Sequence, residues 1–596
     1  MTPSALAYQG GITHGYQYDS GTNGKGRLTQ LTEPNSTTQY AYDAKGRLTT
    51  ETRTINAVAY AMGYTYDGSG RLSGMTYPSG RTVAYTFDSL GRIQGINTTQ
   101  GSSQPVVSNV AYYPFGAVQG FTFGNSQTYT RGIDQDGRIA SYTLGAQSFA
   151  VGYDNASRIT FINEITNPPN SNTYGYDLLD RLTSAVLPST PYSFGYDAVG
   201  NRLTKTVGAG SSTYTPAATS NRLSSITPSS GPVRTYLHDA NGAVMADGIN
   251  TYAYDTRGRL IQTISVIGTT NYQVNAVGER IRKTNSLGDS VYHYDSQGKL
   301  IAETSPTGTV QKEFIYLGDL PVAVIDAAGA LFFIHADHLD TPRLIANATS
   351  QVVWRWDHTE PFGADMANGN PSGLGTFEFN LRLPGQYFDK ETNTHYNYFR
   401  DYDPGIGRYV ESDPIGLQGG INTYLYAGAN PTSRVDPRGL AGISLSGGVS
   451  GFVATLGGTA SGGVVVGNAG GTPNMCFQSV QCPRFGLGLA FLASIQVGYT
   501  AGQLCTGQTA AAGLFAQGAF GAGLGGTGSI RIGEGGAPSL NSANIGPTMG
   551  WGGAIGGEAC IVTLICVNDP PCCKQPGGCK DPCPTSLRQM SDVIAP

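Results

Sequence analysis

Alternation of apolar and polar positions, broken at short intervals by turn sequences, dominates the first 300 residues of the chain. In the stretch "TTQYAYD" (37–43), every second residue faces the same side of an extended strand, which places Tyr40 and Tyr42 together. Asp43 then begins the turn Asp-Ala-Lys-Gly, in which Asp accepts its own turn's N–H groups and Gly tolerates positive φ. Arg47 starts a return strand, from which its guanidinium can lie over a neighbouring tyrosine ring. The pattern predicts one β-hairpin.

This unit, Tyr-Asp-x-x-Gly-Arg-Leu with variations (the YD unit), recurs along the chain. Ten copies can be read, at 42–48, 66–72, 87–93, 133–139, 153–159, 176–182, 196–203, 238–244, 254–260 and 294–300. Adjacent aspartates lie mostly 20–24 residues apart, and we interpret gaps of 46 residues after Asp88 and 42 after Asp197 as places where a copy has degenerated. A single hairpin cannot bury its apolar face, whereas many stacked hairpins can. The regular phasing therefore favours one continuous all-β sheet over unrelated hairpins in several sandwiches.

Composition agrees with a β-protein and excludes some partners. Charged residues are 13% of the chain, against an average of about 25%, and the sequence holds 84 Gly and 35 Tyr. The net charge of −5 gives no reason to expect a nucleic-acid partner. The N-terminus has neither a basic region nor an apolar core of the kind found in Sec signal peptides. No run of about 18 apolar residues predicts a transmembrane helix.

Two similar pentads precede an abrupt change of composition. "SDPIGL" (412–417) and "VDPRGL" (435–440) place Asp413 and Asp436 at matching positions, 23 residues apart. All seven His lie before residue 441 and all nine Cys after it, so two chemically different polypeptides join at Leu440. Two carboxylates held close together share a proton, and such a pair can activate water and protonate a peptide bond. The alternative is that both pentads are only β-turns, for which Asp-Pro-x-Gly is a good sequence.

The YD units resemble those of Rhs proteins, Tc-toxin C components and teneurins. The resemblance to the bacterial Rhs core is much closer from about residue 313, through "FIHADHLDTPRLIAN" (333–347), "VVWRWDHTEPFGA" (352–364) and the long string from 380 to 440. It covers about three quarters of the chain. It implies that the hairpins spiral into a hollow β-shell whose core string curls inward and which encloses a variable C-terminal region, usually a toxin.

The same resemblance implies a cut in the chain. Carried over to this sequence, it makes Asp413 and Asp436 catalytic residues of an aspartyl-type autoprotease and the Leu440–Ala441 peptide bond the cleavage site. An arginine near the first pentad assists in some relatives, and Arg408 in "GIGRYVESDP" is our candidate.

Residues 335–340, "HADHLD", contain four side chains of chelating type. In a strand-rich segment their spacing scatters them over both faces, so we predict no metal site and no cofactor. The aromatic residues around them, such as Trp354 and Trp356, are interpreted as shell core.

Residues 441–596 lack the groups of a conventional hydrolytic toxin. They contain no His, only two Glu and three Asp, and no Walker-type phosphate loop. Alternation in "LGLAFLASIQVGYTA" (487–501), and shorter runs at 443–445, 463–466 and 529–532, predict a Gly-rich β-meander. A water-soluble sheet, a membrane-active tail and a poorly ordered enclosed segment remain alternatives. The nine Cys suit disulfides of an exported protein, with zinc binding and free thiols as the other readings.

We therefore predict three regions: a YD-repeat shell at 1–312, an Rhs core with an autoprotease at 313–440, and a Gly- and Cys-rich variable region at 441–596. The expected function is a bacterial toxin carrier, secreted or at the cell surface, whose partners are its own C-terminal segment, an immunity protein and a delivery apparatus. Because the chain begins almost directly in a repeat, we expect a fragment or one of several chains of a particle. The alternative function is a non-catalytic secreted or surface binding protein.

Overall fold

The computed structural model describes residues 14–114 and 116–440, together with the backbone of residues 5–7, of residue 13 and of ten strands within 441–596. The chain divides into two compact units, residues 1–451 and 452–596. Nearly every regular element is a β-strand, which confirms the all-β expectation.

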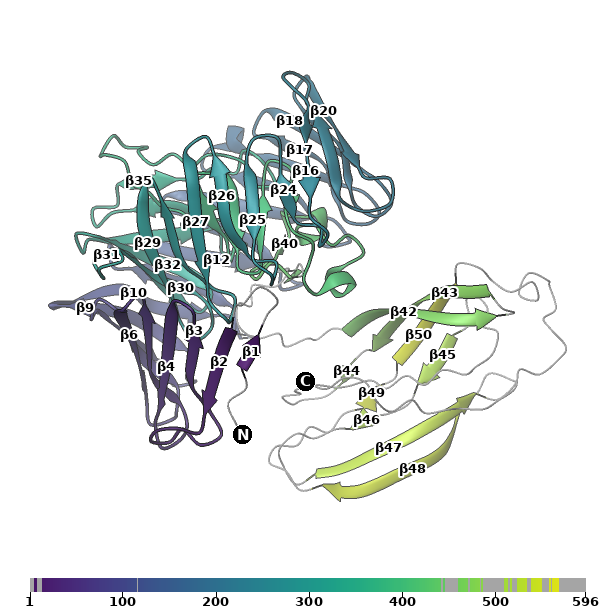
Figure 1. The fold of residues 1–596 in the computed structure, drawn as a ribbon, viewed down its shortest axis with the longest axis horizontal. Helices are drawn as coiled ribbons and strands as arrows, with labels where there is room; N and C mark the ends of the chain where they lie inside the picture. Colours follow the sequence, from purple (N-terminus) through teal and green to yellow (C-terminus); the bar gives the residue numbers. More distant parts are fainter. Residues whose placement is uncertain are drawn as a thin grey trace. The chain divides into compact units, whose positions relative to one another are not determined.

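The first sheet is a meander in which every strand pairs antiparallel with the next one along the chain (Figure 1). Its strands are β1 (Ala5–Ala7), β2 (Thr13–Tyr18), β3 (Leu28–Glu33), β4 (Ser36–Tyr42), β5 (Leu48–Ile55), β6 (Val58–Tyr66), β7 (Leu72–Thr76), β8 (Thr82–Phe87), β9 (Ile93–Gln100), β10 (Ser102–Tyr112), β11 (Val118–Phe123), β12 (Thr128–Ile133), β13 (Ile139–Leu144), β14 (Gln147–Tyr153), β15 (Ile159–Glu164), β16 (Asn172–Tyr176), β17 (Leu182–Leu187), β18 (Thr190–Tyr196), β19 (Arg202–Val207), β20 (Gly210–Pro216), β21 (Leu223–Thr227) and β22 (Arg234–Thr235). A short 3₁₀ helix, η1 (Pro168–Asn170), connects β15 to β16.

The second sheet continues the same meander after a break at Tyr236. It contains β23 (Leu237–His238), β24 (Val244–Ala246), β25 (Thr251–Tyr254), β26 (Leu260–Ser265), β27 (Gly268–Val274), β28 (Arg280–Asn285), β29 (Gly288–Tyr294), β30 (Leu300–Thr304), β31 (Val310–Leu317), β32 (Leu320–Asp326), β33 (Leu331–Ala336), β34 (Pro342–Ala346) and β35 (Val352–Arg355). Strand β31 spans the predicted boundary at residues 312/313, so the repeat meander continues to Arg355.

The YD unit forms the predicted hairpin turn. Between β4 and β5, the Gly46 N–H donates to the Asp43 carbonyl oxygen over 2.9 Å, and Gly46 has φ +79°. Asp43 Oδ1 accepts the N–H groups of Lys45 and Arg47, both at 2.9 Å, and its Oδ2 accepts Arg47 Nε at 2.7 Å. The Arg47 guanidinium lies 4.4 Å from the ring centroid of Tyr66 in the next hairpin, as expected. This unit is therefore joined to its neighbour by its arginine and the aromatic ring of the next unit.

The same stacking recurs along the first sheet. Further pairs are Arg27–Tyr42, Arg71–Phe87, Arg92–Tyr112, Arg138–Tyr153, Arg158–Tyr176 and Arg181–Tyr196. The two wide gaps hold degenerate copies, as predicted: Tyr113 and Ala217 occupy the aspartate position of hydrogen-bonded turns.

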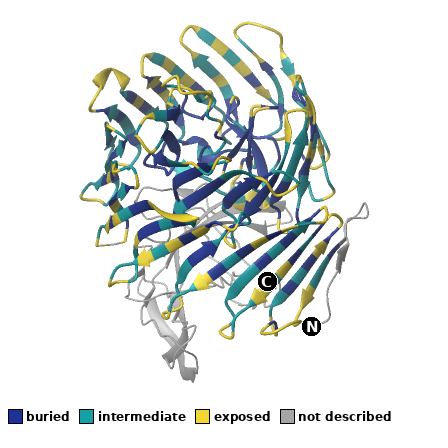
Figure 2. Ribbon diagram, turned by 90° about the vertical axis from the view of Figure 1, so that its left-hand side faces the viewer, coloured by how far each residue is buried: buried dark blue, intermediate teal, exposed yellow. Residues whose placement is uncertain are grey.

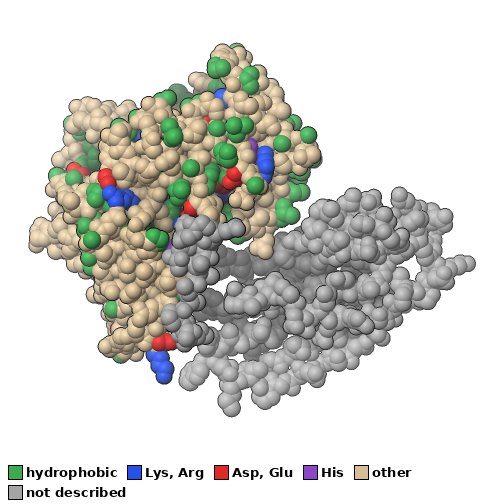
Figure 3. Space-filling model, in the orientation of Figure 1, with side chains coloured by type: hydrophobic (Ala, Val, Ile, Leu, Met, Phe, Trp, Pro, Cys, Tyr) green, Lys and Arg blue, Asp and Glu red, His purple; other side chains and the backbone are tan. Residues whose placement is uncertain are grey.

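Early and late repeats pack against each other across the inside of the curled sheet. Arg81 Nε forms a 2.6 Å ion pair with Glu313, and Tyr77 Oη donates to the Phe314 carbonyl oxygen over 2.7 Å. The largest hydrophobic cluster joins residues 62–129 to residues 301–336. Figure 2 shows exposed residues at the hairpin turns and in bands along the strands, with buried residues in the interior. On the described part of the face in Figure 3, hydrophobic side chains are scattered among polar atoms.

Residues 356–440 contribute many buried side chains to the interior of the first unit, whereas residues 364–378 contribute none. They form β36 (Tyr387–Asp389), β37 (Thr394–Asn397), β38 (Arg400–Asp403), β39 (Arg408–Tyr409) and β40 (Arg434–Val435), with the 3₁₀ helices η2 (Gly416–Gly419) and η3 (Ala427–Ala429). Phe362 packs in the cluster of β13–β18, Tyr402 in that of β29–β35, and Val410 in that of β20–β27. One inward-curling segment thus fills cores contributed by several parts of the sheet.

The remaining strands lie beyond residue 440. They are β41 (Ile443–Ser444), β42 (Thr459–Ala469), β43 (Thr472–Cys482), β44 (Arg484–Phe485), β45 (Thr509–Ala512), β46 (Phe515–Ala516), β47 (Gly523–Ile532), β48 (Pro538–Thr548), β49 (Gly557–Glu558) and β50 (Cys560–Cys566). The runs at 463–466 and 529–532 fall within strands. The expectations for 487–501, and those for the cysteine side chains, lie outside the described residues. Within the part of the chain that the structure describes, no helix is long and apolar enough to cross a membrane.

Candidate functional site

Both pentads fold as turns of the same kind as the YD unit. The Gly416 N–H donates to the Asp413 carbonyl oxygen over 2.9 Å, and the Gly439 N–H donates to that of Asp436 over 3.4 Å. Both glycines have positive φ, +60° and +67°. As in the YD turns, Oδ1 of each aspartate accepts a backbone N–H of its own turn, at 3.0 Å in both cases, from Ile415 and Leu440.

The pentads differ from the YD unit in the side chain that follows the turn. In the YD unit the residue four positions after Asp is Arg, and its guanidinium occupies Oδ2. In both pentads that residue is Leu, which leaves Oδ2 for a group from elsewhere. Arg400 supplies it: its Nη2 lies 2.9 Å from Asp413 Oδ2 and 3.3 Å from Asp436 Oδ2. All three side chains are about 2% exposed. The structure therefore brings the two predicted aspartates together on one buried cation.

Arg400 is held in place by bonds that its other nitrogens make. Its Nε donates to the Gly439 carbonyl oxygen, and its Nη1 donates to that of Thr423 over 2.9 Å. The guanidinium also lies 3.6 Å from the ring centroid of Tyr409. Arg400 thus links both pentads to β39 as well as joining their carboxylates.

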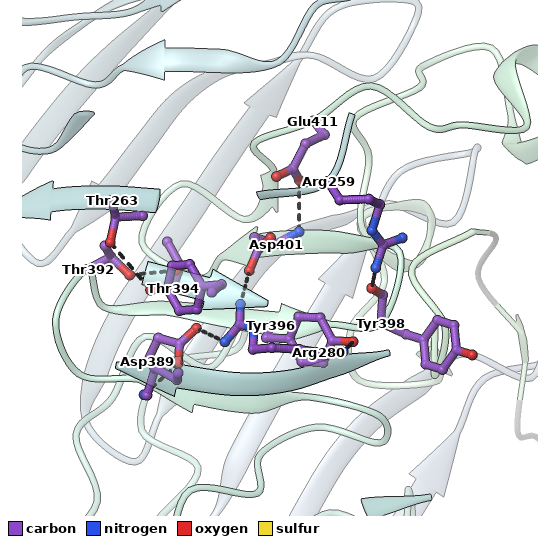
Figure 4. Close-up of polar contacts among 12 residues, drawn as sticks. Arg259, Thr263, Arg280, Asp389, Thr392, Thr394, Tyr396, Tyr398, Asp401 and Glu411 are labelled. Carbon is purple, nitrogen blue, oxygen red and sulfur yellow. Dashed lines mark hydrogen bonds and ion pairs between the residues drawn. The ribbon is translucent and has the colours of Figure 1, made fainter. Parts of the chain in front are cut away.

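The next residue of β38, Asp401, belongs to the polar cluster in Figure 4 that supports the strand. Asp401 accepts Arg280 Nη2 over 2.9 Å, and its N–H donates to Glu411 over 2.8 Å. Arg280 also pairs with Asp389 and lies between the rings of Tyr272 and Tyr396. Because successive side chains of a strand point to opposite faces, this cluster and the aspartate pair lie on opposite sides of β38.

Asp436 has two further neighbours, which come from β37 and β39. Tyr409 Oη donates to Asp436 Oδ2 over 2.8 Å. Asn397 Nδ2 lies 2.7 Å from Tyr409 Oη and 2.7 Å from the Asp436 carbonyl oxygen, and donates to both. The carboxylate of Asp436 thus accepts from Tyr409, Arg400 and the Leu440 N–H.

Burial is the main electrostatic influence on the site. It raises the pKa of the Asp413 carboxyl, and the nearby Asp436 raises it further, against the lowering effects of Arg400 and the Ile415 N–H. Burial and Asp436 together hold the pKa of Tyr409 well above its ordinary value, so Tyr409 remains a hydrogen-bond donor. One guanidinium balances the charge of only one carboxylate, so the other carboxyl of the pair can carry a proton.

The carbonyl oxygen of Leu440 lies close to Asp413. A Cβ placed on Gly419 would lie 2.2 Å from Asp413 Oδ2 and 2.6 Å from the Leu440 oxygen. The two oxygens are therefore at most about 4.8 Å apart, the sum of these distances. Strand β41 pairs with β40 in the register Val435↔Ile443, so the second pentad lies in the connection of a hairpin. Ala441 lies outside the described residues.

Arg408, the candidate for the assisting arginine, makes its contacts with other residues. Its Nη2 donates to the Asn221 carbonyl oxygen, and its guanidinium lies 4.6 Å from the ring centroid of Tyr424. The arginine between the aspartates is Arg400, thirteen residues before Asp413, which sequence reasoning missed. Tyr409, Asn397 and Gly419 were missed too, since no local pattern separates them from ordinary strand and turn residues.

The chelating side chains of residues 335–340 have partners within the protein. Asp337 forms a 2.8 Å ion pair with Arg343, and Asp340 pairs with Arg131 at 2.5 Å. His338 Nε2 lies 2.8 Å from the Thr432 carbonyl oxygen. Among the described residues, no group of three or more His, Cys, Asp or Glu is arranged to hold a metal ion.

A long meander of YD hairpins that curls around its own downstream segment defines a YD-repeat β-shell. The model of the Teneurin YD-shell family matches residues 16–160 and 124–423, and the chain belongs to this family. It is an Rhs/YD-repeat protein, as the resemblance of its repeats and core string indicates.

The relatives include bacterial toxins. The chain is 30% identical over 227 residues to Double-stranded DNA deaminase toxin A of Burkholderia cenocepacia (strain H111), a match that covers 33% of this chain and 16% of that protein. It is 37% identical over 123 residues to Toxin protein Tse5 of Pseudomonas aeruginosa, covering 20% and 9%. The crystal structure of TcdB2-TccC3-Cdc42 shares the fold, with TM-score 0.61 and 18% identity, over 72% of this chain and 26% of that one. This chain therefore spans a small part of each relative's length.

Proposed function

We propose that the protein is a toxin-carrier shell that cuts its own chain between Leu440 and Ala441. The observation that carries the proposal is the meeting of Asp413 and Asp436 on Arg400, within reach of the Leu440 carbonyl oxygen. Membership of a YD-shell family with toxin relatives supports the carrier role. The enclosed C-terminal region, an immunity protein, a delivery apparatus and a secreted or surface location belong to the same proposal.

The arrangement suits hydrolysis of a peptide bond. Two carboxyls that share one proton provide a base for water and an acid for the carbonyl oxygen. The buried guanidinium of Arg400 keeps the pair compatible with a folded core, because two unpaired buried carboxylates would repel each other. The hairpin connection holds the Leu440–Ala441 peptide bond beside the two aspartates. The reaction is therefore intramolecular and needs no encounter with a separate substrate.

Cleavage is tested on the full chain with a tag at each end. We expect the unmodified protein to yield two fragments that co-purify, the second beginning at Ala441. Asp436→Asn and Asp413→Asn should remain single chains of 62.5 kDa. Asp43→Asn, in a YD turn outside the site, is the matched control and should be cut.

An unmodified chain that stays intact would contradict the proposal. The pentads would then act only as turns of the shell, as their hydrogen bonds alone allow.

A further inference from the structure

We infer that the two aspartates have unequal roles: Asp436 is the base that activates water, and Asp413 is the acid that protonates the Leu440 oxygen. Tyr409 and Gly419 are the positioning residues that impose this difference. The inference rests on the proposed self-cleavage and specifies how the site divides its work.

Asp413 is identified as the acid by the atom it faces. Its Oδ2 and the Leu440 carbonyl oxygen lie 2.2 and 2.6 Å from the point that a Cβ on Gly419 would occupy. Both oxygens are hydrogen-bond acceptors, so they attract each other only when one carries a proton, and only the carboxyl can supply it. Burial, which disfavours the charged form of Asp413, acts in the same direction, and Arg400, 2.9 Å from Oδ2, acts against it.

Asp436 is identified as the base by the donors around it. Leu440 N–H donates to Oδ1, while Tyr409 Oη and Arg400 Nη2 both donate to Oδ2. A carboxylate offers about four acceptor positions, two on each oxygen, so the position left among these contacts is on Oδ1. That oxygen is already bound to the N–H of the residue whose carbonyl is attacked. A water that donated to Oδ1 would therefore approach the Leu440 carbonyl group.

The charged and titratable groups that face Asp436 come from several elements. Arg400 from β38 and Tyr409 from β39 both lie against Asp436 Oδ2, and Asp413 shares the Arg400 guanidinium with it. Tyr426 also faces Asp436, and its pKa is raised by burial and by this carboxylate, so it stays neutral. Tyr409 is therefore the neutral donor whose loss leaves every charge in place.

The reaction balances with water alone. The water oxygen bonds to the Leu440 carbonyl carbon, one water proton passes to Asp436, and the Asp413 proton passes to the Leu440 oxygen. The carbon–nitrogen bond then breaks as Asp436 gives its proton to the Ala441 nitrogen and a hydroxyl of the intermediate returns one to Asp413. The products are a carboxyl group at Leu440 and an amine at Ala441.

Gly419 is required because of its missing side chain. It does not have positive φ, so alanine fits its backbone, but a methyl group there would overlap both Asp413 Oδ2 and the Leu440 oxygen. One of the two must move, which separates the acid from its target. Displacements of about 1 Å can lower a rate about 100-fold.

The test follows cutting of full-length chain recovered uncut in urea and diluted into buffers from pH 4 to 9. In Tyr409→Phe we expect the acidic limb of the rate profile to move up by about one pH unit and the rate below it to fall about tenfold. This variant removes the hydroxyl group that donates a hydrogen bond to Asp436 Oδ2. Tyr77→Phe, which removes a buried hydroxyl bonded to the Phe314 carbonyl oxygen, should keep the profile.

Gly419→Ala provides the second arm, with Gly68→Ala as control because a Cβ there would have no neighbour within 4 Å. We expect Gly419→Ala to cut about 100-fold more slowly. If Tyr409→Phe slows cutting equally at every pH, or Gly419→Ala cuts at the normal rate, the division of roles is wrong while self-cleavage stands. An unmodified chain that is not cut at any pH overturns both.

Discussion

Arg400 should stabilise the folded shell through the two carboxylates it joins. The unmodified chain is expected to cut itself, so the reference is Asp436→Asn, which keeps one chain and leaves Arg400 paired with Asp413 at 2.9 Å. Adding Arg400→Met leaves the Asp413 carboxylate buried without a cation. Removing one partner of a buried ion pair costs about 3–5 kcal/mol, because the remaining charge is uncompensated.

A second background isolates the charge interaction. In Asp413→Asn/Asp436→Asn, Arg400→Met removes an arginine that has no carboxylate partner in the pair, so the cost should be smaller. The difference between the two costs, a double-mutant cycle, should be roughly 3 kcal/mol. Urea unfolding is followed by the fluorescence of Trp354 and Trp356, which are buried in the same unit.

The cost should also depend on pH, because burial raises the pKa of Asp413. A folded-state pKa above the unfolded value means that stability is fully present below the unfolded pKa and is lost as pH rises through the folded one. Without Arg400 that pKa rises further, so Arg400→Met should be less damaging at pH 4.5 than at pH 7.5. If Arg400→Met lowers the free energy of unfolding equally in the Asp436→Asn and the Asp413→Asn/Asp436→Asn backgrounds at both pH values, the reasoning is refuted.

Three further outcomes follow from the contacts in the shell. A double-mutant cycle of Arg47→Met and Tyr66→Leu should give a coupling of about 0.5–1 kcal/mol in urea unfolding, and no coupling would show that the ring contact is incidental. Arg280→Met should cost about 3–5 kcal/mol because it leaves the buried Asp401 without its cation and Asp389 with Lys283 alone, whereas the more exposed pair of Arg282 should cost under about 1 kcal/mol; similar costs would contradict this. Burial raises the pKa of Asp403 to about 6, so its stabilisation is present below about pH 4 and is lost as pH rises through 6. Asp403→Asn should flatten that part of a thermal-stability profile, and an unchanged slope would exclude Asp403 as its source.

The hairpins could be predicted from the sequence because their stabilising contacts are local. The turn at Asp43 closes through groups no more than four residues away, and Arg47 reaches a ring in the next hairpin. The degenerate turns at Tyr113 and Ala217 follow from the same spacing. The spacing between units could not predict which early repeat packs against which late repeat, because contacts such as that of Tyr77 with Phe314 join residues 237 positions apart.

The sequence suggested two residues of the candidate site, and their catalytic role stays a prediction. The matching places of Asp413 and Asp436 in their pentads identified the carboxylates, and the same matching had a second reading, that of two turns. The structure shows that the pentads are turns and that their carboxylates also meet. Arg408 was chosen because it is nearer in sequence, yet Arg400 lies on the strand that faces both turns.

The sequence by itself determined the repeating hairpin, the all-β class, the change of composition at Leu440 and the identity of the two aspartates. These depend on alternation, turn chemistry and residue counts, all of which act over a few neighbouring residues. Only the tertiary structure decided which cation joins the aspartates, which tyrosine donates to Asp436 and why Gly419 has no side chain. Those contacts bring together residues 6 to 36 positions apart, and the way residues 356–440 fold back inside the shell sets their distances.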